Sequence, residues 1–240
     1  DAVIMCHPCT ESEESGTTLG LGALQFEFRG ISAHAALPKE DCRNALDALV
    51  MSYLNINNLK QYIPGANIYG IIDNGGSRPN IIPDYASMKY YIRAASKKKL
   101  QEYMDRVAGC VRHTARASGV SVDVTEFENR VEGLVTNHTL SDVFKENYEK
   151  LTTLRLKKPE TYAATSAIGN VSNVVPTLHS WIGITSAGGP ALHNPEFTAA
   201  TMTDFAAGEM LSAAVAMAQT GYQVITEPEL LQKIRLEFEK

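Results

Sequence analysis

The chain has 240 residues, of which 44% are hydrophobic and 20% are charged, and its formal net charge is −5 at pH 7. This composition is too apolar for a disordered protein, and it has no basic excess that would favour nucleic-acid binding. The sequence contains no run of about 18 apolar residues, so it predicts no membrane-spanning helix. Four cysteines are too few for a disulfide scaffold and favour a reducing, cytoplasmic location.

The chain opens on an apolar segment that does not have the pattern of a signal peptide. Residues 2–5 predict a buried strand, and the polar residues 10–18 predict a loop. A domain seldom begins with an interior strand, and the first residue is Asp1 rather than Met. We therefore expect a further segment upstream of residue 1.

Residues 21–127 are predicted to form a unit of their own. Alternation and amphipathic spacing predict four strands and two helices, in the order strand 23–29, helix 44–59, strands 67–72 and 85–92, helix 100–117 and strand 120–127. This β-α-β-β-α-β order is that of the ferredoxin-like fold, an antiparallel sheet with two helices on one face.

The flanking residues, 1–20 and 128–240, are predicted to form one α/β domain that the ferredoxin-like unit interrupts. The pattern predicts helices over 139–151 and 197–219, a buried strand over 181–185, and a last helix that begins at Glu227 and Pro228.

His7 is a candidate metal ligand because it follows the first predicted strand, and ligands gather at the carboxyl ends of strands in open α/β sheets. A hydrogen-bonded structural histidine is an equal alternative. Cys6 and Cys9 also form a C-x-x-C pair, which is typical of redox proteins or of half a zinc site. The polar residues after Cys9 lack the helical pattern that the redox interpretation needs.

Four further positions offer chemistry, although each of them alone is more often structural. His34 lies between small residues that leave its ring accessible, and Asn80 offers an amide donor and acceptor. Arg93 lies at the end of a predicted strand, and its guanidinium could bind a carboxylate through two hydrogen bonds. His193 follows a turn that contains Gly188 and Gly189, where the backbone can approach a ligand closely.

Together these motifs resemble the dinuclear-metal amidohydrolases and exopeptidases of metallopeptidase family twenty. This family includes aminoacylases, carboxypeptidases and auxin-conjugate hydrolases. The resemblance runs over essentially the whole chain, and residues 168–179 resemble the aminobenzoyl-glutamate utilisation and β-alanyl-dipeptidase branch. It implies an α/β/α catalytic domain, incomplete in this chain, with an inserted ferredoxin-like lid that commonly dimerises.

The resemblance also implies roles for the candidate residues. His7 and His193 match metal ligands, and His34 matches the lid histidine that polarises the scissile carbonyl. Asn80 and Arg93 match the pair that holds the substrate carboxylate, and Gly188 and Gly189 match the turn that lines the pocket. Two divalent metal ions, zinc or manganese, are implied as cofactors, with a homodimer and an N-acyl amino acid or dipeptide as partners.

The family's remaining metal ligands and its glutamate general base are expected upstream of residue 1. The three glutamates after His7 (Glu11, Glu13 and Glu14) lie in the wrong place for that motif, and Ala167 stands where the branch often has an acidic residue. The leading hypothesis is a metal-dependent amidohydrolase. The alternatives are an inert module that only dimerises and a C-x-x-C redox protein.

Overall fold

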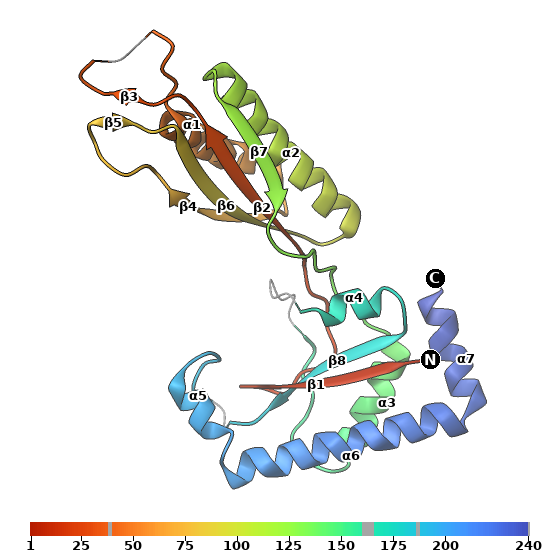
Figure 1. Cartoon of the computed structure of the whole chain (residues 1–240). Coiled ribbons are helices and arrows are strands. Elements are labelled where there is room, and N and C mark those ends of the chain that lie inside the picture. Colours follow the sequence, from red (N-terminus) through yellow and green to blue (C-terminus); the bar gives the residue numbers. More distant parts are fainter. Residues whose placement is uncertain (38–39, 160–165, 186–187, 240) are drawn as a thin grey trace. The chain divides into compact units, whose positions relative to one another are not determined.

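The computed structural model describes residues 1–37, 40–159, 166–185 and 188–239 (Figure 1). The chain divides into two compact units. The split unit contains Asp1–Thr18 and Leu134–Lys240, and the inserted unit contains Leu19–Gly133. The sequence pattern predicts an inserted unit over 21–127, so the observed unit is a few residues longer at each end.

The inserted unit is a four-stranded antiparallel sheet with two helices on one face, as the sequence predicts. Its elements are β2 (Gly20–Arg29), α1 (Ala45–Leu59), β4 (Asn67–Asn74), β6 (Tyr85–Ala94), α2 (Lys97–Ala117) and β7 (Ser121–Glu126). The sheet order is β4-β6-β2-β7, and every neighbouring pair is antiparallel. This order confirms the ferredoxin-like fold.

Alternation along the strands fixes which face of this sheet the helices cover. Phe26 and Phe28 of β2 and Met88 of β6 are fully buried with Leu49 of α1 and Val107 of α2 in one core. Both helices begin at side-chain caps, which satisfy backbone N–H groups that have no partner within the helix. The Asn44 side chain accepts from two N–H groups of α1, and the Ser96 side chain accepts from one N–H group of α2.

A short arm extends from the inserted unit. It consists of β3 (Ala33–His34) and β5 (Ile81–Ile82), which pair antiparallel. At its base, Ile31 and Arg43 exchange two backbone hydrogen bonds of 2.9 and 3.0 Å. The backbone of Arg43 comes close to Gly30, where an added Cβ would lie 2.1 Å from the carbonyl oxygen of Arg43. Gly30 therefore allows the arm to be fixed to the sheet.

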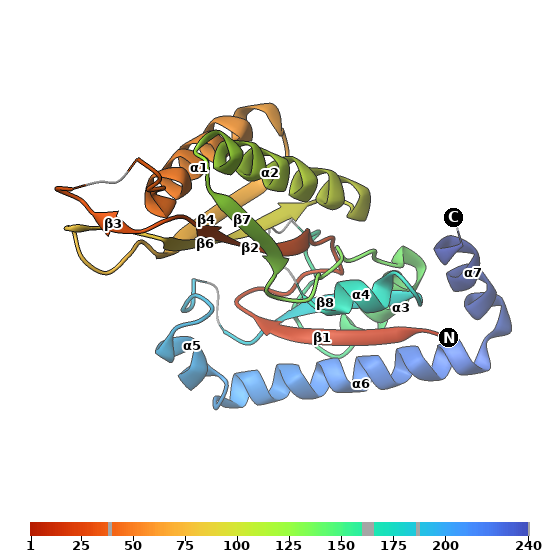
Figure 2. The same cartoon turned by 45° about the horizontal axis from the view of Figure 1, so that its top comes forward.

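The split unit is built on two parallel strands, β1 (Val3–Cys9) and β8 (Thr177–Gly183). Its helices are α3 (His138–Tyr148), α4 (Ile168–Ser172), α5 (Pro195–Ala200), α6 (Asp204–Thr226) and α7 (Pro228–Phe238). Figure 2 shows α6 running along the strand pair. Residues of α3, α6 and α7 bury Leu178 and Ile182 of β8 in one core, with Ile4 of β1 packed against it.

Three predicted elements of the split unit have different bounds in the structure. The first strand continues to Cys9 instead of ending at Met5, and β8 begins four residues before the predicted strand. The predicted helix 197–219 is two helices, α5 and α6. They separate because the Thr203 side chain accepts from the N–H of Ala206 and begins a new helix there.

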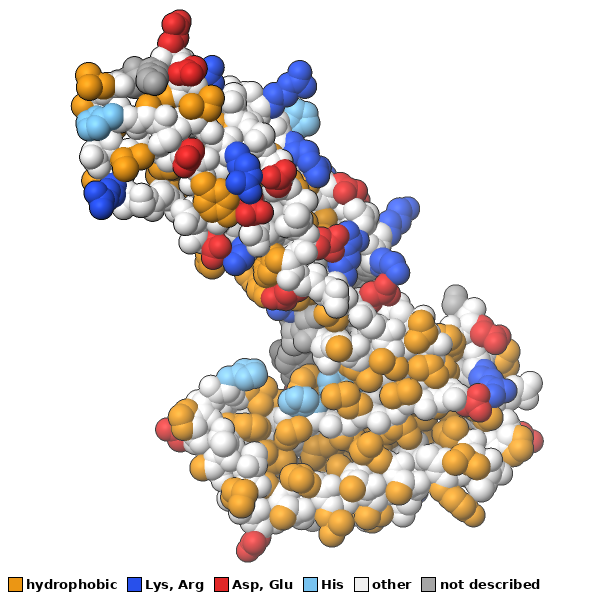
Figure 3. Space-filling view, in the orientation of Figure 1, with side chains coloured by type: hydrophobic (Ala, Val, Ile, Leu, Met, Phe, Trp, Pro, Cys, Tyr) orange, Lys and Arg blue, Asp and Glu red, His pale blue; other side chains and the backbone are white. Residues whose placement is uncertain are grey.

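Helix α6 is unusually apolar, with two acidic residues and no basic residue among its 23. It leaves large apolar side chains exposed, and Figure 3 shows hydrophobic side chains gathered over this part of the split unit. None of the helices in the described part of the chain is both long and apolar enough to cross a membrane.

Candidate functional site

Two histidines and the single tryptophan cluster on one face of the β1–β8 pair. Strand register places Met5 beside His179 and His7 beside Trp181, so that all four side chains share a face. The ring centroid of Trp181 lies 4.7 Å from that of His7 and 4.8 Å from that of His179. The two histidine centroids are 6.1 Å apart with an interplanar angle of 73°.

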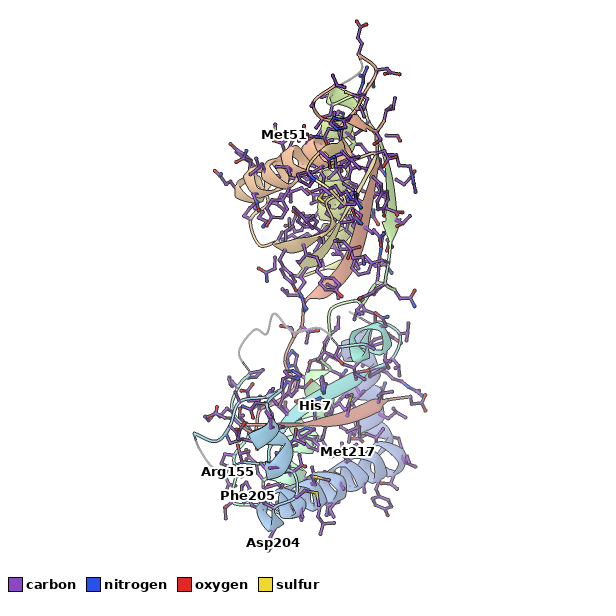
Figure 4. The ribbon with its side chains drawn as sticks, turned by 60° about the vertical axis from the view of Figure 1, so that its left-hand side comes forward. His7, Met51, Arg155, Asp204, Phe205 and Met217 are labelled. Carbon is purple, nitrogen blue, oxygen red and sulfur yellow. The ribbon has the colours of Figure 1, made fainter. Side chains whose placement is uncertain are left out.

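His7 has one ring nitrogen tied to the backbone. Its Nδ1 lies 2.8 Å from the carbonyl oxygen of Pro8 and donates to it when it carries the proton. This arrangement holds the neutral ring in the tautomer whose Nε2 can accept a ligand, which is how ligating histidines are commonly oriented. Figure 4 shows His7 on its strand. It lies within β1, whereas the sequence pattern places it after the strand.

His179 is the functional candidate that sequence reasoning does not select. Its residue is 1% exposed, and neither Nδ1 nor Nε2 has a hydrogen-bond partner among the described residues. Burial, and then the neighbouring His7, lower the pKa of His179 to about 4, so its ring is neutral at pH 7. A neutral imidazole carries one donor and one acceptor, and leaving them both unpaired in a protein interior is costly.

His193 has a backbone conformation that is rare for its residue type. Its φ is +64°, and it is the one residue other than glycine with a positive φ in the described ranges. It immediately precedes Asn194, whose side chain caps α5 by accepting from Phe197. The left-handed conformation is compatible with a functional constraint on this exposed side chain. In the preceding turn, Gly188 also has a positive φ (+78°), with open space where a Cβ would be.

The three glutamates after His7 have structural roles. Glu11 pairs with Lys157 at 2.7 Å, and Glu14 pairs with Lys145. The backbone of Glu13 exchanges two hydrogen bonds with Trp181 and extends the sheet beyond β8. Among the residues that the structure describes, no three His, Cys, Asp or Glu side chains form a group that could hold a metal ion.

The C-x-x-C pair lies within β1, which contradicts the redox interpretation. Positions three apart in a strand are about 10 Å apart and point to opposite faces, beyond the reach of a disulfide. Cys6 and Cys9 are both free. Burial raises the pKa of the Cys6 thiol to about 12, so it stays protonated and unreactive at pH 7.

In the inserted unit, the arm brings His34 and Asn80 together. His34 pairs with Ile81 across the two strands, and the next residue, Ala35, donates its N–H to the carbonyl oxygen of Asn80 at 2.9 Å. The Nδ1 of His34 accepts from the N–H of Ala36 at 3.2 Å, which leaves Nε2 to carry the proton. Both residues are exposed, so this pair is available to a ligand.

Arg93 lies at the other end of β6 from the arm. The strand runs from Tyr85 to Ala94, and eight residues of strand separate Tyr85 from Arg93 by about 27 Å. The guanidinium lies over the Tyr69 ring, 5.9 Å from its centroid, and Nε donates to the Tyr69 hydroxyl. One copy of the inserted unit therefore does not bring Asn80 and Arg93 to the same small ligand.

Comparison with known families and curated proteins gives matches to both parts of the chain. Residues 17–118 match the model of the Peptidase dimerisation domain. The chain is 35% identical to the Xaa-Arg dipeptidase of Mus musculus over 99% of its own length and 56% of that protein. It is 34% identical to the Xaa-Arg dipeptidase of Homo sapiens, over 99% of this chain and 55% of that protein. The chain thus spans about half the length of these two curated relatives.

Solved structures show the same fold at low sequence identity. The aminobenzoyl-glutamate utilization protein of Klebsiella pneumoniae matches with a TM-score of 0.64 and 15% identity, over 90% of this chain and 54% of that one. A hydantoinase/carbamoylase family amidase of Burkholderia vietnamiensis matches with a TM-score of 0.65 and 14% identity, over 92% of this chain and 54% of that one.

Proposed function

We propose that this chain is part of a metal-dependent amidohydrolase of metallopeptidase family twenty, because residues 17–118 match the Peptidase dimerisation domain and 99% of the chain is similar to an Xaa-Arg dipeptidase. The bond cleaved is the amide of an N-acyl amino acid or of a dipeptide with a free carboxylate. The observation that carries this proposal is the oriented His7 on β1, in a chain similar to Xaa-Arg dipeptidases over 99% of its length.

His7 and His193 are the residues that would hold divalent metal, with zinc or manganese as the ions. Imidazole nitrogen suits zinc, and manganese would rely more on the carboxylate ligands of the site. The tie from His7 to the Pro8 carbonyl leaves Nε2 as the ligating atom. When bound, such ions lower the pKa of a water molecule and polarise the amide carbonyl. The carboxylate ligands and the general base are proposed to come from the part of the relatives' length that this chain does not span.

The residues of the inserted unit then act on the substrate. His34 donates from Nε2 to the carbonyl oxygen, where negative charge develops in the transition state. Arg93 and Asn80 bind the free carboxylate and orient the amide, with Gly188 and Gly189 lining the pocket.

The wide separation of the arm and Arg93 supports a homodimer in which the arm serves the site of the partner subunit. The inserted unit has the surface for such a dimer. Strand β4 is at the edge of the sheet, and it exposes Ile71 and Ile72. Helix α1 exposes Met51 and Leu54, and Figure 4 shows Met51 on the outer side of that helix. Exposed apolar groups on an edge strand and on a helix of the same unit are typical of an interface.

The test uses the whole protein that contains this chain. Release of amine from N-acyl amino acids and dipeptides is measured before and after exhaustive chelation, and again after zinc or manganese is restored. We expect chelation to abolish hydrolysis, and His193→Ala and His34→Ala each to lower kcat at least about 100-fold. His113→Ala, on the exposed side of α2, is the control.

Two outcomes contradict the proposal. Hydrolysis that survives chelation would show that the reaction needs no metal ion. Hydrolysis that is unchanged in His193→Ala would show that His193 is not part of the active site. A protein that dimerises but hydrolyses none of these substrates supports the inert dimerising module instead.

A further inference from the structure

The sheet of the inserted unit has a hollow lined by aromatic rings on the face that its helices do not cover. The volume of this aromatic hollow is about 510 Å³. Tyr69 of β4 pairs with Tyr91 of β6, and their ring centroids are 6.0 Å apart. Phe127, which follows β7, has its ring centroid 5.6 Å from that of Tyr91. Because Tyr90 is buried in the core under the helices, alternation along β6 turns Tyr91 to the opposite face.

The hydroxyl groups of both tyrosines already have partners. The Tyr91 hydroxyl donates to Glu128 at 2.6 Å, and the Tyr69 hydroxyl accepts from Nε of Arg93. The aromatic hollow therefore offers a ligand mainly ring surface rather than hydrogen-bonding groups. Burial of an apolar group against such a surface is favourable, and edge-to-face or offset contact between rings adds to it.

Two cations beside the aromatic hollow restrict the charge of a ligand group that enters it. The Lys89 ammonium lies 5.8 Å from the Phe127 centroid, and the Arg93 guanidinium lies 5.9 Å from the Tyr69 centroid. Asp73, 3.2 Å from Lys89, offsets one of these charges. A cationic ligand group among the rings would still be repelled by Arg93, whereas an uncharged ring would not be.

Arg93 connects the aromatic hollow to the substrate. In the proposed function, on which this inference rests, its guanidinium binds the free carboxylate. The carboxylate and the side chain of an amino acid branch from the same carbon atom, so a substrate held by Arg93 can place its side chain over the Tyr69 ring. We infer that the aromatic hollow binds the side chain of the substrate's carboxyl-terminal residue, and that an uncharged aromatic side chain fits it best.

Two ligands that differ only in a benzyl group test this inference without any hydrolysis. N-acetylphenylalanine and N-acetylglycine have the same amide and carboxylate, and isothermal titration calorimetry with the 240-residue chain gives the dissociation constant of each. We expect N-acetylphenylalanine to bind at least about tenfold more tightly, because its ring leaves water. Equal affinities, or no binding of either ligand, would overturn the inference. Tighter binding of N-acetylarginine would also overturn it, because the hollow would then be a site for a cation.

Phe127→Ala is expected to bring the ratio of these two affinities close to one, since it removes a wall of the hollow. Phe205→Ala is the matched control, because Phe205 lies on α6 in the other unit and is 44% exposed. Arg93→Gln should weaken the binding of both ligands, because both have the carboxylate. A ratio that Phe127→Ala leaves unchanged would overturn the inference.

A second measurement covers the case in which Phe127→Ala does not fold. Ile71 of β4 lines the aromatic hollow, and a ligand ring beside it changes the magnetic field at its methyl groups. In the unaltered chain, the methyl NMR signals of Ile71 should therefore shift with N-acetylphenylalanine much more than with N-acetylglycine. The signals of Ile225, exposed on α6, are the control. Equal shifts at Ile71 with the two ligands would contradict the inference.

Assays of the whole protein separate this inference from the proposed function. A dipeptide that ends in phenylalanine should have a higher kcat/KM than one that ends in glycine, and Phe127→Ala should lower that ratio. Hydrolysis of both dipeptides without preference would reject the inference while the proposed function stands. A preference for N-acetylphenylalanine that depends on Phe127, in a protein that hydrolyses neither dipeptide, would retain the binding site and reject the proposed reaction.

Discussion

His193 has a left-handed backbone conformation, which has a cost that depends on the residue placed there. With φ at +64°, a side chain bearing Cβ is strained, whereas glycine is not. We therefore predict that His193→Gly leaves the split unit more stable than His193→Ala does, by up to about 1 kcal/mol. Thermal unfolding followed by Trp181 fluorescence measures this difference.

The same two variants separate the proposed function of His193 from its structural role. Neither carries an imidazole, so both are expected to lose hydrolysis to the same extent in the whole protein. If activity followed stability instead, with the glycine variant active, His193 would be a structural residue.

Gly30 is predicted to be intolerant of any side chain. A Cβ at this position would lie 2.1 Å from the Arg43 carbonyl oxygen, which is a backbone atom that cannot rotate away. We expect Gly30→Ala to destabilise the inserted unit by about 1–3 kcal/mol, because the Ile31–Arg43 pairing must shift. Circular dichroism during thermal unfolding measures the loss.

Gly109→Ala is the matched control for Gly30→Ala. Gly109 is inside α2 with open space where an added Cβ would lie, and alanine favours the helix by up to about 1 kcal/mol. An equal loss in both variants would mean that the contact at Gly30 does not determine the stability of this unit.

At the scale of elements, a carboxylate from helix α7 accepts hydrogen bonds from the first N–H groups of helix α3. Glu237 of α7 accepts from the N–H groups of His138 and Thr139 at 2.7 and 2.8 Å, and from the Thr139 hydroxyl at 2.6 Å. Burial of Glu237 raises its pKa, but these hydrogen bonds outweigh burial, and the net pKa lies below the usual value of 4.5. Glu237 therefore links the start of α3 to the end of α7.

We predict that Glu237→Gln costs about 1–2 kcal/mol at pH 7. Because the folded pKa is lowered, the stabilisation is complete above the unfolded pKa and is lost as pH falls through the folded pKa. The difference between the two proteins should therefore shrink as pH falls below 4.5. Thermal unfolding followed by Trp181 fluorescence at several pH values tests this, with the exposed Glu239→Gln as control. A difference that is constant with pH would contradict it.

The sequence predicts the inserted unit well because its elements carry strong local signals. Strand β2 alternates large apolar and polar residues, and the α2 pattern ends at Gly119, which has a φ of +71°. In the split unit, the local sequence pattern and the tertiary packing disagree at β8. The strand begins with polar residues, Thr177 and Ser180 among them, that tertiary packing buries. The apolar pattern therefore predicts a strand that begins later in the sequence than β8 does.

The candidate site was predictable only in part, for a related reason. His7 and His34 stand out beside short motifs, whereas His179 becomes a candidate only once strand register places it beside His7. Register between strands so far apart in the sequence is not encoded in local pattern. The tie from His7 to the Pro8 carbonyl is likewise visible only in three dimensions, as is the lack of partners for the His179 ring among the described residues.

At the scale of the whole molecule, we predict that the inserted unit forms the dimer contact through α1 and β4. Met51→Glu combined with Leu54→Glu places two charges on an exposed apolar face and should convert a dimer into a monomer. Analytical ultracentrifugation measures this, with Ile225→Glu on the exposed face of α6 as control. A dimer that is lost in the Ile225→Glu control but kept in the α1 variant would place the contact on the split unit.

The pairing of β1 with β8 also determines the order in which this protein can fold during synthesis. Val3 pairs with Thr177, a separation of 177 − 3 = 174 residues, and the whole inserted unit lies between them. At about 5–20 residues per second, the ribosome needs roughly 9–35 s to bridge that gap. The inserted unit is continuous in sequence and can fold as it emerges. Strand β1 must remain without β8 for that interval, so its backbone groups are open to wrong strand pairing until β8 emerges.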